Sequence, residues 1–499
     1  MQLTRPFLAL ASSLALLGAV ASTPVQPERR DTSVVFDGRT FVNKGLVAFG
    51  RVSGDAKDSY GESLGGFGSA IALESFKKQR DGTYVASLRA QPDRGYNVIE
   101  QTDYRARQHK LRLVLNPAAA SNGTENIQTT YESTTLYSFK PAFFNGDRNF
   151  TTGLDPIAVR PAAGIQPALP LAPSNNHISF DTEGLALDTN GDGAWISDEY
   201  GPHIHYISRH TGQIKSTIAP PRAILPYHSG VLNFTSNTEP TTGRSTNQGF
   251  EGLTLDRNTD TLWACTQSAV AQDGGGSKAT NRHARLLGYN VKNPARPRLV
   301  AEYIVPLPQS SKGNTRAQSE IHVVDSTTFL ILARDGNGFG DSSSDSTFKS
   351  VDLISTKGAT NIANTKYDDP ANPAAPGGKL NADITPVAYT SFVNLIQPAE
   401  LAKFGLHVGG AFDRGLIAAK LESLALAPTS DAAGEFFLFV VSDNDFVTNK
   451  GAQAAQAPNG SYVVAPFSDP YAEQYGTADT QIFVWRVTLP GYNQKPLPN

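Results

Sequence analysis

The stretch Phe180-Asp-Thr-Glu183-Gly-Leu-Ala-Leu-Asp188 decides the fold, because its pattern recurs along the chain. A turn follows it, and then a second short run, Ala194-Trp-Ile-Ser-Asp198-Glu199, which ends in acidic residues. Self-similarity of this kind is the signature of a repeat architecture. Further copies contain Glu251, Glu320 and Glu422, and a degenerate copy spans residues 68–89.

Each copy is predicted to be a β-hairpin, in which antiparallel pairing places the start of the first strand beside the end of the second. The 44 glycines and 32 prolines are spread along the chain and separate short apolar runs, as is typical of all-β proteins. Repeated hairpins in one long chain favour a single β-propeller of about six or seven blades with long inserted loops. We interpret the Pro-, Ala- and Gly-rich stretch 357–385 as one such loop.

The first residues are typical of a secretory signal peptide. Arg5 precedes a short apolar run, and small residues near position 21 suit cleavage there. We therefore expect a signal peptide over 1–21, a propeptide or N-terminal segment over 22–44, the propeller over 45–490 and a tail over 491–499. Four N-x-[ST] sequons fit a secreted, extracellular glycoprotein; they begin at Asn122, Asn149, Asn233 and Asn459.

The composition argues against several classes of partner. The chain carries 43 Lys and Arg against 46 Asp and Glu, with a formal net charge of −3 and no basic run, so we expect no nucleic-acid binding. No second apolar run approaches the roughly 20 residues of a membrane helix, so we expect no membrane partner. Cys265 is the only cysteine and excludes an intrachain disulfide. We expect a monomer that binds a small ester or phosphate ester.

The repeated glutamates predict a cation site. In a propeller the first strand of each blade lines the axis, so the hairpin ends should meet at one mouth of the channel. Clustered carboxylates repel one another unless a cation neutralises them, and Ca²⁺ takes six to eight oxygen ligands. The alternative is that each glutamate accepts backbone N–H groups and stabilises its own blade. The expected ligands are Glu183, Glu251, Glu320 and Glu422, with Asp198, Asp335 and Asp443 beside them.

Catalytic groups are expected around that ion. Bound calcium would polarise a phosphoryl or carbonyl oxygen and orient a water. An acidic ring alone would repel a phosphate, so cations at hairpin ends, above all Arg89 and Arg334, are expected to bind the anion. Glu199 is expected to act as a general base. His203 and His205 would share one strand face, either as ligands or as ordinary hydrogen-bonded histidines. Further candidate cations are Arg94 and Lys349.

Several ordered motifs resemble one known family. The Glu-Gly-Leu hairpin starts, the Trp195–Pro202 corner, the Asp93-Arg-Gly-Tyr96 turn and the Arg334-Asp-Gly-Asn-Gly338 turn resemble those of secreted esterase-like phytases, or phytase-like domain proteins. The resemblance runs from about residue 45 to 490. The hairpin starts are also similar to those of calcium-dependent β-propeller phytases, which implies calcium at the four glutamates. The chain departs from that group in its longer, irregular blades and in lacking a dense Lys/Arg set.

The resemblance implies a phosphoric-ester hydrolase. Our leading expectation is a secreted hydrolase of phosphate esters or other esters at a metal site on the propeller axis. A non-catalytic extracellular binding propeller with structural calcium is an alternative from another class. A calcium-dependent lactonase on a similar propeller is a third reading. Turnover of phosphate esters, acetate esters and lactones separates the three.

Two short motifs are interpreted as coincidences. Residues 188–193 together with Glu199 match the EF-hand pattern, but apolar runs flank them where an EF-hand needs helices. We expect a hairpin turn there. Gly61-Glu-Ser63-Leu-Gly65 matches the nucleophile elbow of serine hydrolases, yet it lacks the strand before it and the helix after it. We expect a glycine-rich loop.

Overall fold

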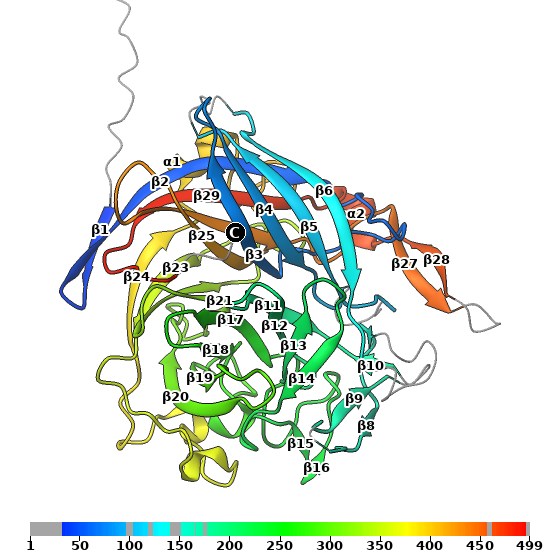
Figure 1. Ribbon diagram of the computed structural model, residues 1–499, viewed down its shortest axis with the longest axis vertical. Coiled ribbons are helices and arrows are strands. Elements are labelled where there is room, and N and C mark those ends of the chain that lie inside the picture. The colour runs from blue at the N-terminus through cyan, green and yellow to red at the C-terminus, as the bar shows by residue number, and fades with distance from the viewer. Residues whose placement is uncertain are drawn as a thin grey trace, which may run out of the picture. The chain divides into compact units, whose positions relative to one another are not determined.

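The computed structural model describes residues 32–95, 103–117, 123–139, 151–164, 166–172, 177–456 and 462–495 (Figure 1). These belong to one compact unit that begins at Asp31. The predicted signal peptide lies outside the described residues, and so do the sequons at Asn122, Asn149 and Asn459.

Four sheets have the same simple order, in which each strand pairs antiparallel with the next one along the chain. The apolar runs after each glutamate form the innermost strand, and Gly- and Asp-rich turns connect the hairpins. The first sheet has β3 (Ala70–Lys78), β4 (Tyr84–Gln91), β5 (Arg107–Leu115) and β6 (Ile127–Leu136), and the second has β11 (Thr182–Leu187), β12 (Gly193–Asp198), β13 (Ile204–Ser208) and β14 (Ile214–Ile218). The third has β17 (Phe250–Asp256), β18 (Thr261–Thr266), β19 (His283–Asn290) and β20 (Arg298–Pro306), and the fourth has β21 (Ala317–Val323), β22 (Thr328–Arg334), β23 (Lys349–Ser355) and β24 (Ala388–Asn394).

A fifth sheet joins the two ends of the chain. Its order is β25-β26-β29-β2-β1, so the N-terminal strands complete a sheet begun by C-terminal ones. Val42 of β2 pairs with Thr488 of β29, and Phe49 with Phe483. The expected boundary at residue 44 therefore falls inside a strand. The strands are β1 (Thr32–Phe36), β2 (Arg39–Val52), β25 (Lys420–Pro428), β26 (Glu435–Asp443) and β29 (Thr480–Thr488).

Smaller elements connect these sheets. A four-stranded sheet of short strands and one hairpin lie between large sheets along the chain, and a second hairpin is inserted within the fifth sheet. Neither of the two short α-helices among the described residues is long enough to cross a membrane. The short sheet has β7 (Thr151–Thr152), β8 (Ala158–Arg160), β9 (Leu169–Leu171) and β10 (Ile178–Ser179). The hairpins are β15 (Tyr227–His228) with β16 (Val231–Leu232) and β27 (Gly451–Gln456) with β28 (Tyr462–Phe467). The helices are α1 (Pro398–Leu401) and α2 (Pro470–Tyr475), and short 3₁₀ turns lie at Ala271–Asp273, Lys366–Asp368, Pro376–Gly378 and Ala402–Phe404.

The innermost strands of the five large sheets contact one another in the order β3, β11, β17, β21, β25 and back to β3. This arrangement of sheets around one axis is the predicted all-β propeller. The stretch 357–385 is an inserted loop between β23 and β24, as expected. The number of blades, expected to be six or seven, remains a prediction.

Apolar side chains fill the spaces between neighbouring sheets. Between the fourth and fifth sheets, for example, Phe49 and Trp485 pack with Leu332, and all three are buried. Because both faces of these strands are covered, the runs are apolar throughout rather than alternating. The core needs no disulfide, and Cys265 lies buried inside it as a free thiol.

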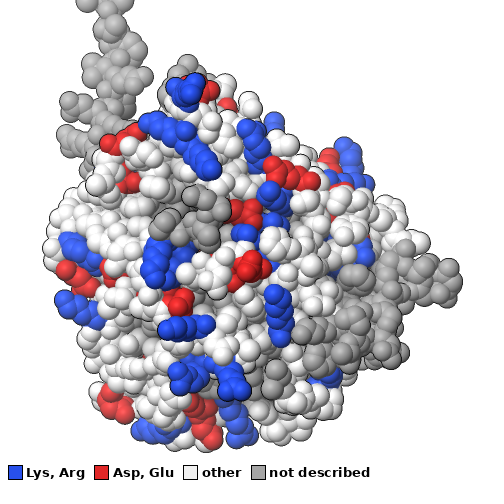
Figure 2. Space-filling model, in the orientation of Figure 1, with Lys and Arg blue, Asp and Glu red and all other residues white. Residues whose placement is uncertain are grey.

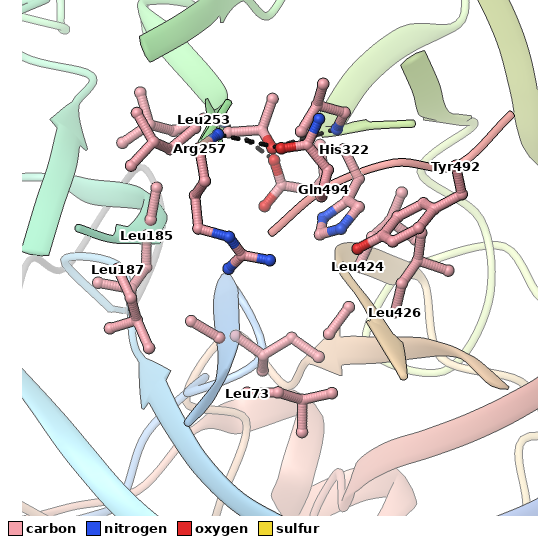
Figure 3. A pocket seen from close by; sticks show the side chains of 18 residues that line it. Leu73, Leu185, Leu187, Leu253, Arg257, His322, Leu424, Leu426, Tyr492 and Gln494 are labelled. Carbon is pink, nitrogen blue, oxygen red and sulfur yellow. Dashed lines mark hydrogen bonds between the residues drawn. The ribbon is translucent and has the colours of Figure 1, made fainter. Parts of the chain in front are cut away.

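A cavity lined by both apolar and polar side chains lies inside the ring of inner strands (Figure 3). Leu185, Leu253 and Leu424 line it, and the chain's last described segment closes part of it through Tyr492 and Gln494. The Gln494 amide donates to Asp256 at 3.1 Å, and its oxygen accepts the N–H of Arg257 at 3.0 Å. The expected tail is therefore packed against the propeller up to the last described residue.

Both short motifs have the structures expected of them. Asp188 accepts N–H groups of Gly191 and Gly193 at 2.6 and 3.0 Å and closes a hairpin turn between β11 and β12. Ser63 lies in a loop, where its hydroxyl accepts the N–H of Ala452 at 2.9 Å. Neither has the helices that the EF-hand or the nucleophile elbow requires.

Candidate functional site

Buried carboxylates from separate parts of the chain meet at one place. Glu183 of β11, Glu251 of β17 and Glu199, which follows β12, each offer an oxygen within 4.8 Å of the other two. Glu183 also joins a second such group with Asp93 and Asp181. All five side chains are at most 6% exposed. We call these five residues the carboxylate cluster.

A β-bulge presents each of the two strand glutamates to the cluster. The pairing of β11 with β12 shifts between Thr182 and Leu185, and that of β17 with β18 shifts between Phe250 and Leu253. In each bulge, the two residues of a Glu-Gly pair lie opposite a single residue of the partner strand. A bulge bends its strand and redirects a side chain, and bulges are common beside active sites.

The glycine of each pair lets the inner strands approach closely. A Cβ on Gly184 would stand 2.4 Å from Leu253 Cβ and 2.7 Å from the carbonyl oxygen of Glu251. A Cβ on Gly252 would stand 2.6 Å from the backbone nitrogen of Ile321. No larger residue fits either position without moving a strand.

Asp198 anchors the corner that carries Glu199. Its carboxylate accepts N–H groups of Asp181 at 3.0 Å, Tyr200 at 3.2 Å and Gly201 at 3.0 Å. The N–H of Glu199 in turn donates to the carbonyl of Asp181 at 2.9 Å. Asp198, expected beside the ion, thus positions two members of the cluster instead of joining it. Burial raises its pKa to about 7, against the effect of the backbone N–H groups.

Cations partly neutralise the surroundings of the cluster. Arg94 Nε lies 3.5 Å from Asp181 Oδ2, and Lys420 Nζ lies 3.3 Å from Asp93 Oδ2. Lys420 also contacts Asp443 at 2.6 Å and Asp445 at 3.3 Å. Arg334 pairs with Glu422. Of the expected ligands, Glu422 is held by Arg334. Asp443 is held by Lys420 and also offers an oxygen within 4.8 Å of Asp93 and Asp445, so it adjoins the cluster.

The buried carboxylates of the cluster raise one another's pKa values. Burial raises the pKa of Glu183 well above its ordinary value, and the neighbouring Glu251 and Asp181 raise it further. The pKa of Glu199 is raised by burial and by Asp181, and that of Glu251 by burial and by Glu199. Burial also raises the pKa of Asp93 to about 6, although Lys420 opposes this. Such mutual repulsion is relieved when a cation binds.

The structure does not bring every expected ligand to the cluster. In β21 the extra residue of the bulge is Ser319, so Glu320 stands one position later than Glu183 and Glu251 do. Its carboxylate accepts N–H groups of Leu253 at 2.9 Å and Ile321 at 2.7 Å and borders the axial cavity. For Glu320, the contacts are those of the alternative interpretation, in which the glutamate accepts backbone N–H groups and stabilises its blade. Asp335 likewise accepts N–H groups of Thr347 at 2.7 Å and Phe348 at 3.0 Å.

Two expected catalytic groups also lie elsewhere. Arg89 Nε bonds Glu74 at 2.7 Å on the first sheet, away from the five carboxylates. His203 is 1% exposed, and burial lowers its pKa to about 3. It is therefore neutral and out of contact with solvent. Lys349 is buried against Asp335 and the carbonyl of Ala419.

Sequence reasoning missed two members of the cluster, Asp93 and Asp181. Both belong to the motifs described above: Asp181 lies two residues before the repeat glutamate Glu183, and Asp93 lies in the Asp-Arg-Gly-Tyr turn. Lys420, two residues before Glu422, was missed as a cation. The available signals were an acidic residue just before a strand start for Asp181 and one just after a strand end for Asp93.

Comparisons with known proteins agree with the sequence resemblance. The family model "Phytase-like: Esterase-like activity of phytase" matches residues 132–446. An uncharacterized secreted protein of Arthroderma benhamiae is 35% identical over 502 residues, which cover 89% of this chain and 97% of that protein.

Solved structures resemble the chain only distantly. A luciferin-regenerating enzyme is 9% identical over 87% of this chain and 95% of its own, with a TM-score of 0.28. The periplasmic gluconolactonase of Pseudomonas aeruginosa is 9% identical over 83% and 88%, also with a TM-score of 0.28. The sequence matches carry the assignment: this chain belongs to the phytase-like family.

Proposed function

We propose that this protein is a secreted hydrolase of phosphate esters, or of related esters, acting at a calcium site in the carboxylate cluster. The observation that carries the proposal is the convergence of Glu183, Glu199 and Glu251 in a buried site. Membership of the phytase-like family supports the reaction class, and the secreted relative supports the location.

The donors present fit calcium. Glu183, Glu199, Glu251, Asp93 and Asp181 offer only oxygen atoms, which this ion prefers. Glu199 Oε1 is buried and has no hydrogen-bond partner among the described residues. An unpartnered buried carboxylate oxygen is costly unless a cation contacts it.

The chain's own residues supply the rest of the chemistry. When bound, calcium would polarise the phosphoryl oxygen of the ester. Lys420 and Arg334 are more exposed than Arg94, with side chains 19%, 13% and 3% exposed, which supports them as the cations that would bind the phosphate oxygens. Glu199, a member of the cluster, is expected to accept the proton of the attacking water through the oxygen that does not contact calcium.

The test combines metal content with turnover. The double variant Glu183→Gln/Glu251→Gln should lose bound calcium and at least about 100-fold in hydrolysis of p-nitrophenyl phosphate, within the range for loss of a major electrostatic contribution. Glu74→Gln is the matched control, because it makes the same change on an inner strand outside the cluster. A chelator should abolish wild-type activity and added calcium should restore it.

The outcomes separate the functions. Unchanged turnover in the double variant would refute the site. Calcium binding without hydrolysis of phosphate esters, p-nitrophenyl acetate or lactones would indicate a binding propeller. Hydrolysis of lactones alone would indicate a lactonase.

A further inference from the structure

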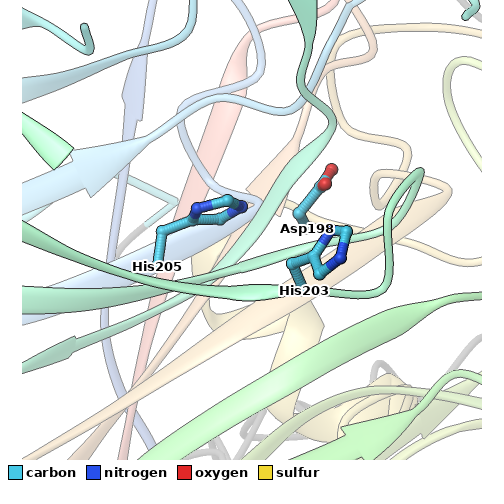
Figure 4. Close-up of side chains that lie close together, drawn as sticks. All are labelled: Asp198, His203 and His205. Carbon is cyan, nitrogen blue, oxygen red and sulfur yellow. The ribbon is translucent and has the colours of Figure 1, made fainter. Parts of the chain in front are cut away.

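Asp198, His203 and His205 form a group of metal-binding side chains separate from the carboxylate cluster (Figure 4). Asp198 ends β12, and His205 lies on β13 opposite Ile196. His203 and His205 are two residues apart and so share one face of the chain. One ligand atom from each of the three lies within 4.8 Å of the others. The side chains are at most 1% exposed.

Two imidazole nitrogens in this group lack partners. His203 Nδ1 and His205 Nε2 are buried, and neither has a hydrogen-bond partner among the residues that the structure describes. Buried polar atoms are nearly always hydrogen-bonded, and each exception calls for an explanation such as an ion. A metal that accepts both lone pairs would satisfy both atoms at once.

Gly201 leaves an open position between the ligands. A Cβ on this residue would stand 2.1 Å from His203 Nδ1 and 2.8 Å from Asp198 Oδ2. Both atoms therefore face the same small space, which the absence of a side chain keeps free. The φ of Gly201 is not in the left-handed region, so backbone conformation is not the reason for glycine here.

Neighbouring groups hold the ligands in place. The three backbone N–H groups on Asp198 fix its carboxylate. His205 Nδ1 lies 3.0 Å from the Thr217 hydroxyl. If Nδ1 carries the proton and donates it to that oxygen, Nε2 presents its lone pair. Outer partners of this kind orient the ligands of metal sites.

We propose that Asp198, His203 and His205 bind a zinc ion. Imidazole nitrogens suit first-row transition metals, whereas calcium prefers oxygen alone. Two histidines and one carboxylate are a common zinc ligand set, with a fourth position left for water. Ligands of a tetrahedral zinc lie about 3.4 Å apart, so only small side-chain shifts are needed.

This zinc would act as a positioning ion. It would fasten the 198–205 corner, which carries Glu199 into the carboxylate cluster. Removing it should lower the unfolding temperature and weaken the cluster's calcium affinity without abolishing it. The inference does not depend on hydrolase activity.

The test measures metal content in the full chain, produced without a polyhistidine tag. We expect about one zinc per chain by mass spectrometry of metals. We also expect visible absorption typical of tetrahedral Co²⁺ after cobalt replaces zinc. 1,10-Phenanthroline, which binds zinc but not calcium, should remove the ion and lower the unfolding temperature.

Three variants probe the ligands. His205→Gln, His203→Gln and Gly201→Ala should each lower zinc content at least about fivefold; the last fills the open position and displaces His203. His109→Gln is the control, because His109 is equally buried but both its ring nitrogens are partnered, by Thr134 and Leu64. Absence of zinc and of the cobalt spectrum in the folded wild type would overturn the proposal. So would full zinc content in the ligand variants.

Discussion

At the scale of one residue, Glu320 tests whether a repeat glutamate binds calcium or accepts backbone N–H groups. The Glu320→Gln variant should keep calcium affinity within about threefold of wild type, because its partners are backbone N–H groups that a Gln oxygen can also accept. Glu251→Gln should weaken it at least about tenfold, or about 1.4 kcal/mol. Isothermal titration with calcium on metal-free protein measures both. Equal losses in the two variants would return Glu320 to the ligand set.

The same residue shows what sequence could and could not predict. The hairpin register of the repeat predicts that Glu183 and Glu251 lie close together, and in the structure each belongs to a Glu-Gly bulge. No glycine follows Glu320, and a slip of one residue in a strand turns a side chain to the other face. The position of a bulge depends on how neighbouring sheets pack, and the sequence repeat does not show that packing.

His109 is expected to make stability depend on pH. Burial, together with the charge of Arg107, lowers the pKa of His109 to about 3, against about 6.5 in an unfolded chain. Between these values the unfolded chain binds a proton that the folded chain excludes. The contribution of His109 to stability is therefore fully present above pH 6.5. Below pH 6.5 this group lowers the free energy of unfolding by up to about 1.4 kcal/mol for each pH unit, until the pH reaches the pKa of the folded state.

Urea unfolding at pH 7.5 and 5.5 tests this. His109→Gln should be less stable at pH 7.5, yet lose less stability on acidification than wild type. The exposed His210→Gln is the control and should keep the wild-type slope. Identical slopes in wild type and His109→Gln would contradict the expectation.

At the scale of elements, the contact between β11 and β17 links stability to the cluster. Gly184→Ala would place a Cβ against Leu253 and the Glu251 backbone, neither of which can swing aside. We expect a loss of about 1–3 kcal/mol from overpacking. Calcium affinity should fall as well, because Glu183 and Glu251 would move apart. Gly336→Ala has open space around it and is the control. A stable Gly184→Ala variant with wild-type affinity would show that the strands adjust freely.

Charge is distributed differently inside and outside the molecule. On the face shown in Figure 2, Lys and Arg side chains alternate with Asp and Glu over the surface. Acidic groups instead dominate the buried cluster, where Lys420 and Arg334 only partly offset them. Composition predicted the balanced total charge. The concentration of acids in one place comes from the fold, because it depends on strands that are far apart in sequence.

At the scale of the whole molecule, the fifth sheet includes the N-terminal strands β1 and β2 beside C-terminal strands. A chain beginning at Asp31 retains all of β1 and β2 and is the reference for a shorter chain. A chain beginning at Gly45 would lose β1 and the pairs of Val42 and Asn43 with β29. It would also lose Phe41, which is fully buried and contacts Phe392 edge to face. Removing one buried Phe side chain costs about 3–5 kcal/mol.

We therefore expect the chain from Gly45 to unfold at a much lower temperature or to accumulate as aggregate, since the end of β29 at Val487 and Thr488 would lose its partner and present an unpaired edge. Trp485 lies in β29 and is fully buried, so its fluorescence reports on this sheet once Trp195 and Trp263 of the other sheets are replaced by Phe. Phe41→Ala in the longer chain separates lost packing from lost strand pairing. Processing at residue 30 is compatible with the fold, whereas processing at 44 would remove part of a sheet. If the shorter chain kept wild-type stability, the N-terminal strands would be dispensable, and a propeptide over 22–44 would become the better reading.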